Sequence, residues 1–304
     1  IYILMKKNKN KKLHLVSIRL NCHNAEKFLK KSISSVIKQK YRNWELIIFD
    51  NCSNDNTKIE LLKFKKNKKI KYFRSNKLHN LYNARNLAIK KAKGSLITFL
   101  DADDWWLKDK LDKQVKFLEK NKDINIVYSN LFLFNEKKNK TYLFSKDKLY
   151  NGKITQLLLN DFKMPILTTM IRKKIFLKYS FDKTYSIIGD FDLFLRLSLK
   201  EKIFSIQKPL AFYRIHDSNM TTRKIHLNIK ELENWLYKNC KKKYFKNYNF
   251  LNVKKIIQSL KIKKNFINGN MINALKEIFK NPFNIYNVKY IIFLILPKNF
   301  INKI

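Results

Sequence analysis

The stretch Leu100-Asp101-Ala102-Asp103-Asp104-Trp105-Trp106 places three carboxylates within four residues. The chain of 304 residues has 23 acidic side chains against 66 basic ones, so this cluster runs against its surroundings. The apolar run before it, Ser95 to Leu100, predicts a buried strand opened by Gly94, and a helix is predicted after it, over Lys108 to Asn121. The aspartates therefore follow the carboxyl end of a strand, where open α/β sheets bind ligands.

Neighbouring carboxylates repel one another, and two of them about 4 Å apart cost roughly 4 kcal/mol at an effective dielectric of ~20. A partly buried cluster of this kind therefore needs a positive partner. A hard divalent cation, Mg²⁺ or Mn²⁺, fits, bound through one or two carboxylates and the phosphate oxygens of a substrate. The alternative is an Asp-rich turn that caps the next helix, and this role suits Asp104 best of the three.

Strands and helices alternate before the cluster. Strands are predicted at Leu13–Leu20, Trp44–Phe49 and Ile70–Arg74, and helices at Ala25–Gln39, Asp55–Lys65 and Leu81–Ala92. This alternation predicts right-handed βαβ units and an α/β fold with a mostly parallel sheet flanked by helices. Polar loops follow the first, second and fourth strands, so we expect them to line one crevice that holds a nucleotide. Because neither GxGxxG nor a P-loop occurs, phosphate must be held by metal, Arg or Lys.

The second half of the chain ends in helices. Strands are predicted at Ile124–Phe134, Lys140–Phe144, Leu167–Arg172 and Leu210–His216, and helices at Ile154–Asn160, Arg223–Cys240, Val253–Ile267 and Met271–Lys280. We expect a catalytic domain over residues 13–220 and a lysine-rich helical extension over residues 221–304. The segment Tyr290–Leu296 is too short to span a membrane. It can lie on an anionic membrane surface with its apolar side down, or pack as a helix on the catalytic domain.

The formal net charge of +43 invites a nucleic-acid interpretation. However, the cations are 58 Lys and 8 Arg, spread over nearly every segment, which an AT-rich coding bias would produce. We therefore expect no nucleic-acid partner, but attraction to anionic membranes and phosphorylated substrates. Three cysteines without a disulfide pattern, and no apolar leader, predict a cytoplasmic protein, or one peripheral on the inner face of the cell membrane.

A series of short motifs runs through the first half of the chain. They are Asn24–Leu29, Trp44–Ile48, Asp50–Asp55, Ala84-Arg85-Asn86, Ala92-Lys93-Gly94 and Leu100–Asp104. Together they resemble the family 2 glycosyltransferases of the GT-A fold, and the resemblance extends over about Val16 to Met220. It implies a Rossmann-like GT-A sheet and a nucleoside-diphosphate sugar as donor, with a UDP-sugar favoured.

The resemblance also implies roles for the residues around the acidic cluster. Asp101 and Asp103 would contact the nucleotide-sugar and the metal, with Asp103 as the primary metal ligand. Arg85 would lie near the base or the diphosphate. His216, at the end of the last predicted strand, would be a third contact to the metal or diphosphate; as an isolated histidine it is equally open to a structural role.

The base-binding residues implied by the resemblance are Asp50 and Asn51, with Asn21 and His23 beside them. Family members commonly have Pro, Thr or Ser, and Tyr where this chain has Asn21, Cys22 and His23. His23 can still stack on a base, although the Tyr hydroxyl is missing, and a simple surface-loop role is the alternative. Asn51 stands where a second aspartate is usual. These departures leave the identity of the base open.

A second motif places Gly189-Asp190 at the start of a predicted helix. It resembles the family's motif for the catalytic base, which implies that Asp190 takes the proton of the acceptor hydroxyl. Asp192 lies about 200° further around the helix, so the two carboxylates cannot serve one site equally. The alternative for Asp190 is a helix N-cap.

Together the motifs predict a metal-dependent, inverting glycosyltransferase of the hexosyltransferase type. It would act on a hydroxyl of a glycan or lipid-linked acceptor in cell-surface polysaccharide synthesis. One alternative is a basic protein that binds nucleic acid or anionic lipid and carries a degenerate transferase domain. Another is a nucleotidyltransferase, against which the missing Gly-rich phosphate loop argues.

Overall fold

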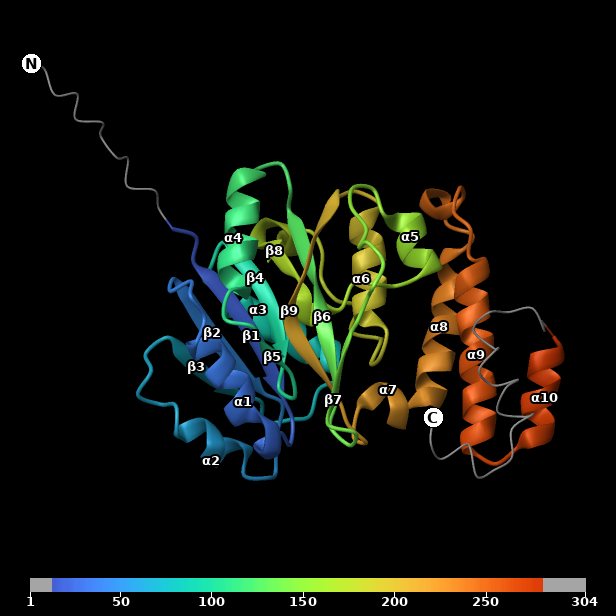
Figure 1. Cartoon of the computed structure of the whole chain (residues 1–304), viewed down its shortest axis with the longest axis horizontal. Helices are drawn as coiled ribbons and strands as arrows, with labels where there is room; N and C mark the ends of the chain where they lie inside the picture. The colour runs from blue at the N-terminus through green and yellow to red at the C-terminus, as the bar shows by residue number, and fades with distance from the viewer. Residues whose placement is uncertain (1–12, 281–304) are drawn as a thin grey trace, which may run out of the picture.

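A computed structural model describes residues 13–280, which fold around one mixed sheet (Figure 1). Its strands are β1 (Val16–Cys22), β2 (Trp44–Asp50), β3 (Ile70–Arg74), β4 (Leu96–Asp101), β5 (Trp105–Trp106), β6 (Ile126–Asn135), β7 (Lys140–Leu143), β8 (Met170–Arg172) and β9 (Ile203–Ile215). Its helices are α1 (Glu26–Ile37), α2 (Thr57–Leu62), α3 (Leu81–Lys90), α4 (Lys110–Lys120), α5 (Thr155–Asn160), α6 (Gly189–Ser198), α7 (Met220–Arg223), α8 (Ile225–Asn239), α9 (Leu251–Ile267) and α10 (Met271–Phe279). The predicted α/β architecture is thereby confirmed.

The first half of the sheet is parallel, in the order β3-β2-β1-β4. Every residue of β2 is buried, as expected for a strand that is covered on both faces. Cys22 lies opposite Asp50, and Asn21 lies opposite Asp101, so the carboxyl ends of β1, β2 and β4 meet at one edge. The three polar loops that follow these strands therefore share this edge, as the sequence predicted.

The second half of the sheet was predicted less completely. β8 runs antiparallel between β4 and β6, and the first part of the predicted strand Leu167–Arg172 is instead a 3₁₀ turn, Ile166–Thr168. β9 begins at Ile203, seven residues before the predicted start, and Pro209 lies at a break in its register with β6, where the missing donor is tolerated. β5 was not predicted; it is a two-residue strand paired with β9.

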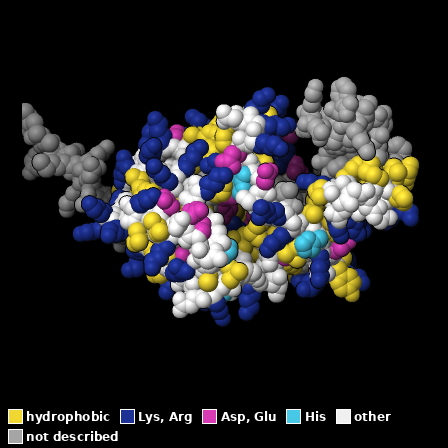
Figure 2. Space-filling view, turned by 90° about the horizontal axis from the view of Figure 1, so that it is seen from below, with side chains coloured by type: hydrophobic (Ala, Val, Ile, Leu, Met, Phe, Trp, Pro, Cys, Tyr) yellow, Lys and Arg dark blue, Asp and Glu magenta, His cyan; other side chains and the backbone are white. Residues whose placement is uncertain are grey.

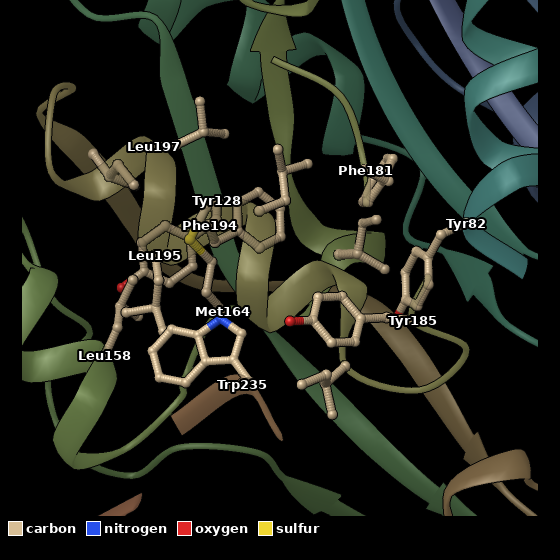
Figure 3. Close-up of a cluster of buried hydrophobic side chains, with 14 of the residues drawn as sticks. Tyr82, Tyr128, Leu158, Met164, Phe181, Tyr185, Phe194, Leu195, Leu197 and Trp235 are labelled. Atoms are coloured by element: carbon tan, nitrogen blue, oxygen red, sulfur yellow. The ribbon is translucent and has the colours of Figure 1, made fainter. Parts of the chain in front are cut away.

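Two large hydrophobic clusters cover the sheet. One packs β1 and β4 against α1 and α4. The other contains residues of α3, α5 and α6, and it also includes Ile225, Ile229, Leu232 and Trp235 of α8. Figure 3 shows the Trp235 indole beside Leu158 and Leu195. The two segments that we divide near residue 220 therefore share one core, and the division itself remains a proposal.

Membrane contact was predicted for the apolar segment Tyr290–Leu296, which lies outside the described residues. Over residues 13–280, none of the helices combines the length and apolar character needed to cross a bilayer.

Arg19, in the middle of β1, offers a test of how this core is built. It is 1% exposed, and its Nε, Nη1 and Nη2 atoms find no hydrogen-bond acceptor among residues 13–280. Burying a guanidinium without such bonds costs free energy. We therefore expect Arg19→Met, which keeps the length and removes the charge, to raise Tm by about 3 °C in scanning fluorimetry.

Arg172 is the matched control, because its guanidinium donates to the carbonyls of Ile124 at 2.9 Å and Leu118 at 2.7 Å. Arg172→Met should lower Tm. A lower Tm for Arg19→Met as well would show that the buried guanidinium of Arg19 is stabilising.

Candidate active site

The candidate site lies at the carboxyl edge of β1, β2 and β4. Figure 2 looks onto this face and shows acidic side chains near its middle, bordered by lysine and arginine. The centre of this face is therefore acidic, while its rim is basic.

Asp101 ends β4 and is paired with Arg85 of α3, with Arg85 Nη2 2.8 Å from Asp101 Oδ1. The Arg85 side chain is 5% exposed and that of Asp101 is 30% exposed. Burial lowers the pKa of Arg85, but Asp101, Tyr82 and Asp190 together outweigh burial and the net shift is upward, so Arg85 stays charged. The predicted contact of Arg85 with base or diphosphate stays a prediction; in this structure the guanidinium holds Asp101.

Asp103 is brought together with His216, 113 residues away in the chain. The Asp103 Oδ2 atom lies 3.0 Å from His216 Nε2. Arg214 of β9 donates from Nε to the Asp103 carbonyl at 2.9 Å, which fixes the loop against β9. Two of the three predicted metal ligands thus converge, from β9 and from the loop after β4.

Asp103 and His216 could supply two ligands to a divalent ion. Residues 13–280 contain no group of three or more His, Cys, Asp or Glu side chains placed to hold a metal, and Asp101 is engaged by Arg85. Mg²⁺ and related ions are often held by one or two protein ligands together with substrate phosphate oxygens. A carboxylate and an imidazole, Asp103 and His216, fit an ion held in that way.

Asp104 does not cap the following helix, contrary to the interpretation we gave it from the sequence. Helix α4 begins six residues later, behind Asp109. Asp104 is 1% exposed, and its Oδ1 accepts the backbone N–H of Arg214 at 2.8 Å. Burial, together with Asp103 and Asp101, raises the pKa of Asp104 well above its ordinary value. Its role in this structure is to attach the acidic loop to β9.

Asp190 lies in the first turn of α6, and its Oδ1 is 2.9 Å from the hydroxyl oxygen of Tyr82 on α3. Burial raises the pKa of Asp190, Arg85 and Tyr82 act in the opposite direction, and Asp101 adds to the rise. Arg85, which pairs with Asp101, lies 5.3 Å from the centre of the Tyr82 ring, so Tyr82 and Arg85 connect Asp190 to the acidic loop. The N-cap of α6 is Ile188, so the alternative of Asp190 as the N-cap is wrong.

Asp192 is used elsewhere, as the helical geometry predicted. Its Oδ1 accepts the indole N–H of Trp235 at 3.0 Å, and its Oδ2 pairs with Arg196 at 2.7 Å. One carboxylate of α6 therefore supports packing against α8, while the other contacts Tyr82 of α3.

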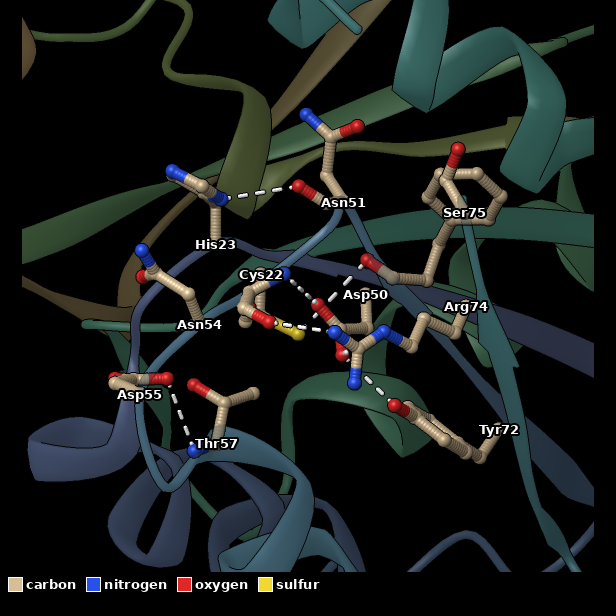
Figure 4. A network of polar contacts seen from close by, with 12 residues as sticks. Cys22, His23, Asp50, Asn51, Asn54, Asp55, Thr57, Tyr72, Arg74 and Ser75 are labelled. Atoms are coloured by element: carbon tan, nitrogen blue, oxygen red, sulfur yellow. Dashed lines mark hydrogen bonds and ion pairs between the residues drawn. The ribbon is translucent and has the colours of Figure 1, made fainter. Parts of the chain in front are cut away.

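The two main base-binding candidates are already bonded within the protein (Figure 4). Asp50 is fully buried, and its carboxylate accepts the Tyr72 hydroxyl at 2.7 Å and the Ser53 N–H at 2.9 Å. The Asn51 side-chain amide forms two bonds with the backbone of His79, at 2.8 and 2.9 Å. These bonds shape the loop, and direct base contact by either residue stays a prediction.

The other two candidates lie at the end of β1. His23 is exposed, and its Nδ1 is 3.0 Å from the Asn51 carbonyl oxygen. The Asn21 Nδ2 atom is buried and finds no acceptor within residues 13–280. Both side chains lie at the predicted edge, and neither role is tested by this arrangement.

Two residues near Asp190 were missed from the sequence. Tyr82 lies one helical turn before Arg85, so the shared face of α3 was an available signal. Glu231 of α8 had no such signal, because it lies 41 residues beyond Asp190. Its carboxylate accepts the N–H groups of Ser186, Ile187 and Ile188 at 2.7, 2.9 and 3.1 Å.

Glu231 therefore caps the start of α6 from another helix, and this can be tested. A glutamine has one acceptor oxygen and turns N–H groups toward the backbone donors, so Glu231→Gln should lower the free energy of unfolding by about 2 kcal/mol. Urea denaturation measures the change.

The control is Glu233→Gln. Glu233 is 44% exposed and pairs with Lys261 at 2.6 Å on the surface, so we expect a loss below about 0.5 kcal/mol. Equal losses for the two variants would argue against a capping role for Glu231.

The family follows from comparison with known proteins. The sequence model of the family described as glycosyl transferase family 2 matches residues 17–186. The Escherichia coli protein named UDP-Glc:alpha-D-GlcNAc-diphosphoundecaprenol beta-1,3-glucosyltransferase WfgD is 32% identical over 213 residues, which cover 69% of this chain and 81% of that protein. The chain belongs to glycosyl transferase family 2 and is a glycosyltransferase.

Further similarities agree with this assignment. The putative teichuronic acid biosynthesis glycosyltransferase TuaG of Bacillus subtilis is 37% identical over 105 residues, which cover 34% of this chain and 42% of that protein. S. aureus TarS 1–349 in complex with UDP-GlcNAc aligns with a TM-score of 0.58 at 15% identity, over 88% of this chain and 73% of that one.

The mannosyltransferase PcManGT from Pyrobaculum calidifontis, solved with GDP-Man and Mn²⁺, aligns with a TM-score of 0.60 at 11% identity. The alignment covers 89% of this chain and 75% of that one. These structures confirm the predicted fold class. The named relatives are glycosyltransferases, as the motifs predicted.

Proposed function

We propose that this glycosyltransferase is metal-dependent and inverting, and that it moves a sugar from a UDP-sugar to a hydroxyl of a glycan or lipid-linked acceptor in cell-surface polysaccharide synthesis. The observation that carries the proposal is a chain of contacts: His216 lies 3.0 Å from Asp103, and Arg85, which pairs with Asp101, lies against the Tyr82 ring whose hydroxyl is 2.9 Å from Asp190. The names of WfgD and TuaG support the rest, since they specify UDP-Glc, a diphosphoundecaprenol-linked acceptor and teichuronic acid biosynthesis.

Asp190 acts as the general base in this proposal. It takes the proton of the acceptor hydroxyl while that oxygen attacks the anomeric carbon from the side opposite the departing diphosphate, and inversion of configuration follows. A carboxylate with a raised pKa is better matched to a reaction near neutral pH than an ordinary one.

Asp103 and His216 would hold Mg²⁺ or Mn²⁺, together with diphosphate oxygens of the donor. When bound, the ion would neutralise the charge that develops on the leaving diphosphate. Arg85 keeps Asp101 in place beside this pair. Since the sequence has no Gly-rich phosphate loop, the bound ion would supply the positive charge that faces the diphosphate.

The base of the nucleotide would lie over the loop formed by Asn21, His23, Asp50 and Asn51. We also propose a cytoplasmic location on the inner face of the membrane, because a chain of net charge +43 is attracted to anionic lipid and a lipid-linked acceptor is presented there.

Replacing Asp190 by Asn should abolish transfer, because the amide cannot take the proton, while binding of the donor is retained. Transfer is measured with a radiolabelled UDP-sugar, and binding by thermal shift with UDP and Mn²⁺. Asp147→Asn, at a carboxylate whose side chain is 80% exposed, is the control and should change neither. Transfer at the wild-type rate by the Asp190 variant would remove this residue from the mechanism.

Replacing Asp103 by Asn should remove the Mn²⁺-dependent part of the thermal shift with UDP. A panel of nucleoside diphosphates with and without Mn²⁺ identifies the base in the same experiment. A shift that is unchanged in the variant, or that never depends on the metal in the wild type, would contradict the proposed metal site.

A further inference from the structure

The short segment 186–190, which carries Asp190, is held by two elements that are distant in the sequence. Glu231 of α8 binds its backbone N–H groups. From the other side, the hydroxyl of Tyr82 on α3 lies 2.7 Å from the carbonyl oxygen of Ile187. The peptide unit between Ile187 and Ile188 therefore has both its carbonyl and its N–H group hydrogen-bonded.

The ring of Tyr82 is locked in place. It is 1% exposed and stacks on Phe181 with ring centroids 5.4 Å apart, an arrangement visible in Figure 3. The Arg85 guanidinium lies 5.3 Å from the centre of the ring. A Cβ atom on Gly189 would come within 2.5 Å of the ring, so only glycine allows this close approach. The glycine of the Gly189-Asp190 motif thus makes room for Tyr82.

The Tyr82 hydroxyl reaches one oxygen of the proposed base. It lies 2.9 Å from Asp190 Oδ1, which also accepts the N–H of Phe191 at 3.1 Å. Among residues 13–280, no hydrogen bond is made to Oδ2. One carboxylate oxygen is therefore fixed, and the other is left for a substrate hydroxyl.

The hydroxyl has one proton and two acceptors. Burial and the charge of Asp190 raise the pKa of Tyr82 well above its ordinary value, so the phenol keeps its proton. While Asp190 is ionised, the hydroxyl can donate to Oδ1. Once Oδ2 has gained the proton of the acceptor hydroxyl, Oδ1 carries no proton and remains an acceptor, so the Tyr82 hydroxyl can go on donating to it. The contact can persist through both states of the base.

We propose that Tyr82 is the positioning residue for Asp190: its hydroxyl holds Oδ1, so that Oδ2 faces the acceptor hydroxyl before and after proton transfer. The proposal rests on the proposed role of Asp190 as the base. It adds a residue that acts through Asp190 without touching the substrate.

The test is Tyr82→Phe, compared with Tyr128→Phe. Tyr128 is fully buried, and its hydroxyl donates to the Tyr150 carbonyl at 3.0 Å, so the control loses a similar bond that does not involve Asp190. We expect kcat of Tyr82→Phe to fall by about tenfold or more, because a misplaced catalytic group is costly, while KM for the donor stays within about twofold. The control should keep wild-type kcat, and both variants should show similar Tm values.

A kcat for Tyr82→Phe equal to that of Tyr128→Phe would overturn the proposal, and so would a loss that appears only in KM or Tm. Asp190→Asn, measured in parallel, separates the two ideas. If that variant turns over normally, the proposed function fails. If it is inactive while Tyr82→Phe is fully active, only the positioning role fails.

Discussion

One buried cation, Arg85, connects the parts of this site. Its guanidinium bonds to Asp101 at the end of β4, lies over the Tyr82 ring, and acts electrostatically on Asp190. Because breaking a buried ion pair costs several kcal/mol, Arg85 holds Asp101 at this position and the acidic loop beside α3. The proposed metal pair and the proposed base therefore belong to one electrostatic unit.

The fold was predictable wherever the pattern is local. Strands such as Ile70–Arg74 and the helices of the first half follow from apolar periodicity, and the convergence of their polar loops follows from parallel pairing. The roles of Asp104 and Glu231 were not predictable in this way, and for Tyr82 the only signal was the helix face that it shares with Arg85. Each role depends on a partner 43 to 110 residues away, and no spacing within the chain specifies such a contact.

The loop proposed to bind the base is shaped by its own side chains. Asn51, which stands where aspartate is usual, uses its amide both to donate to and to accept from the backbone at His79, which a carboxylate cannot do. Cys52 has a φ of 63°, a left-handed conformation that is rare for a residue with a side chain. These bonds and this backbone conformation fix the path of the loop.

The carboxylate of Glu231 has a consequence for engineering. It comes from a helix that lies beyond the part matched by the family model, yet it supports the turn that carries the proposed base. A chimaera that grafts the C-terminal helices of another transferase onto this chain would have to retain an acceptor at this point. Without such an acceptor, exchange of the C-terminal helices would leave the N–H groups of Ser186, Ile187 and Ile188 without their partner.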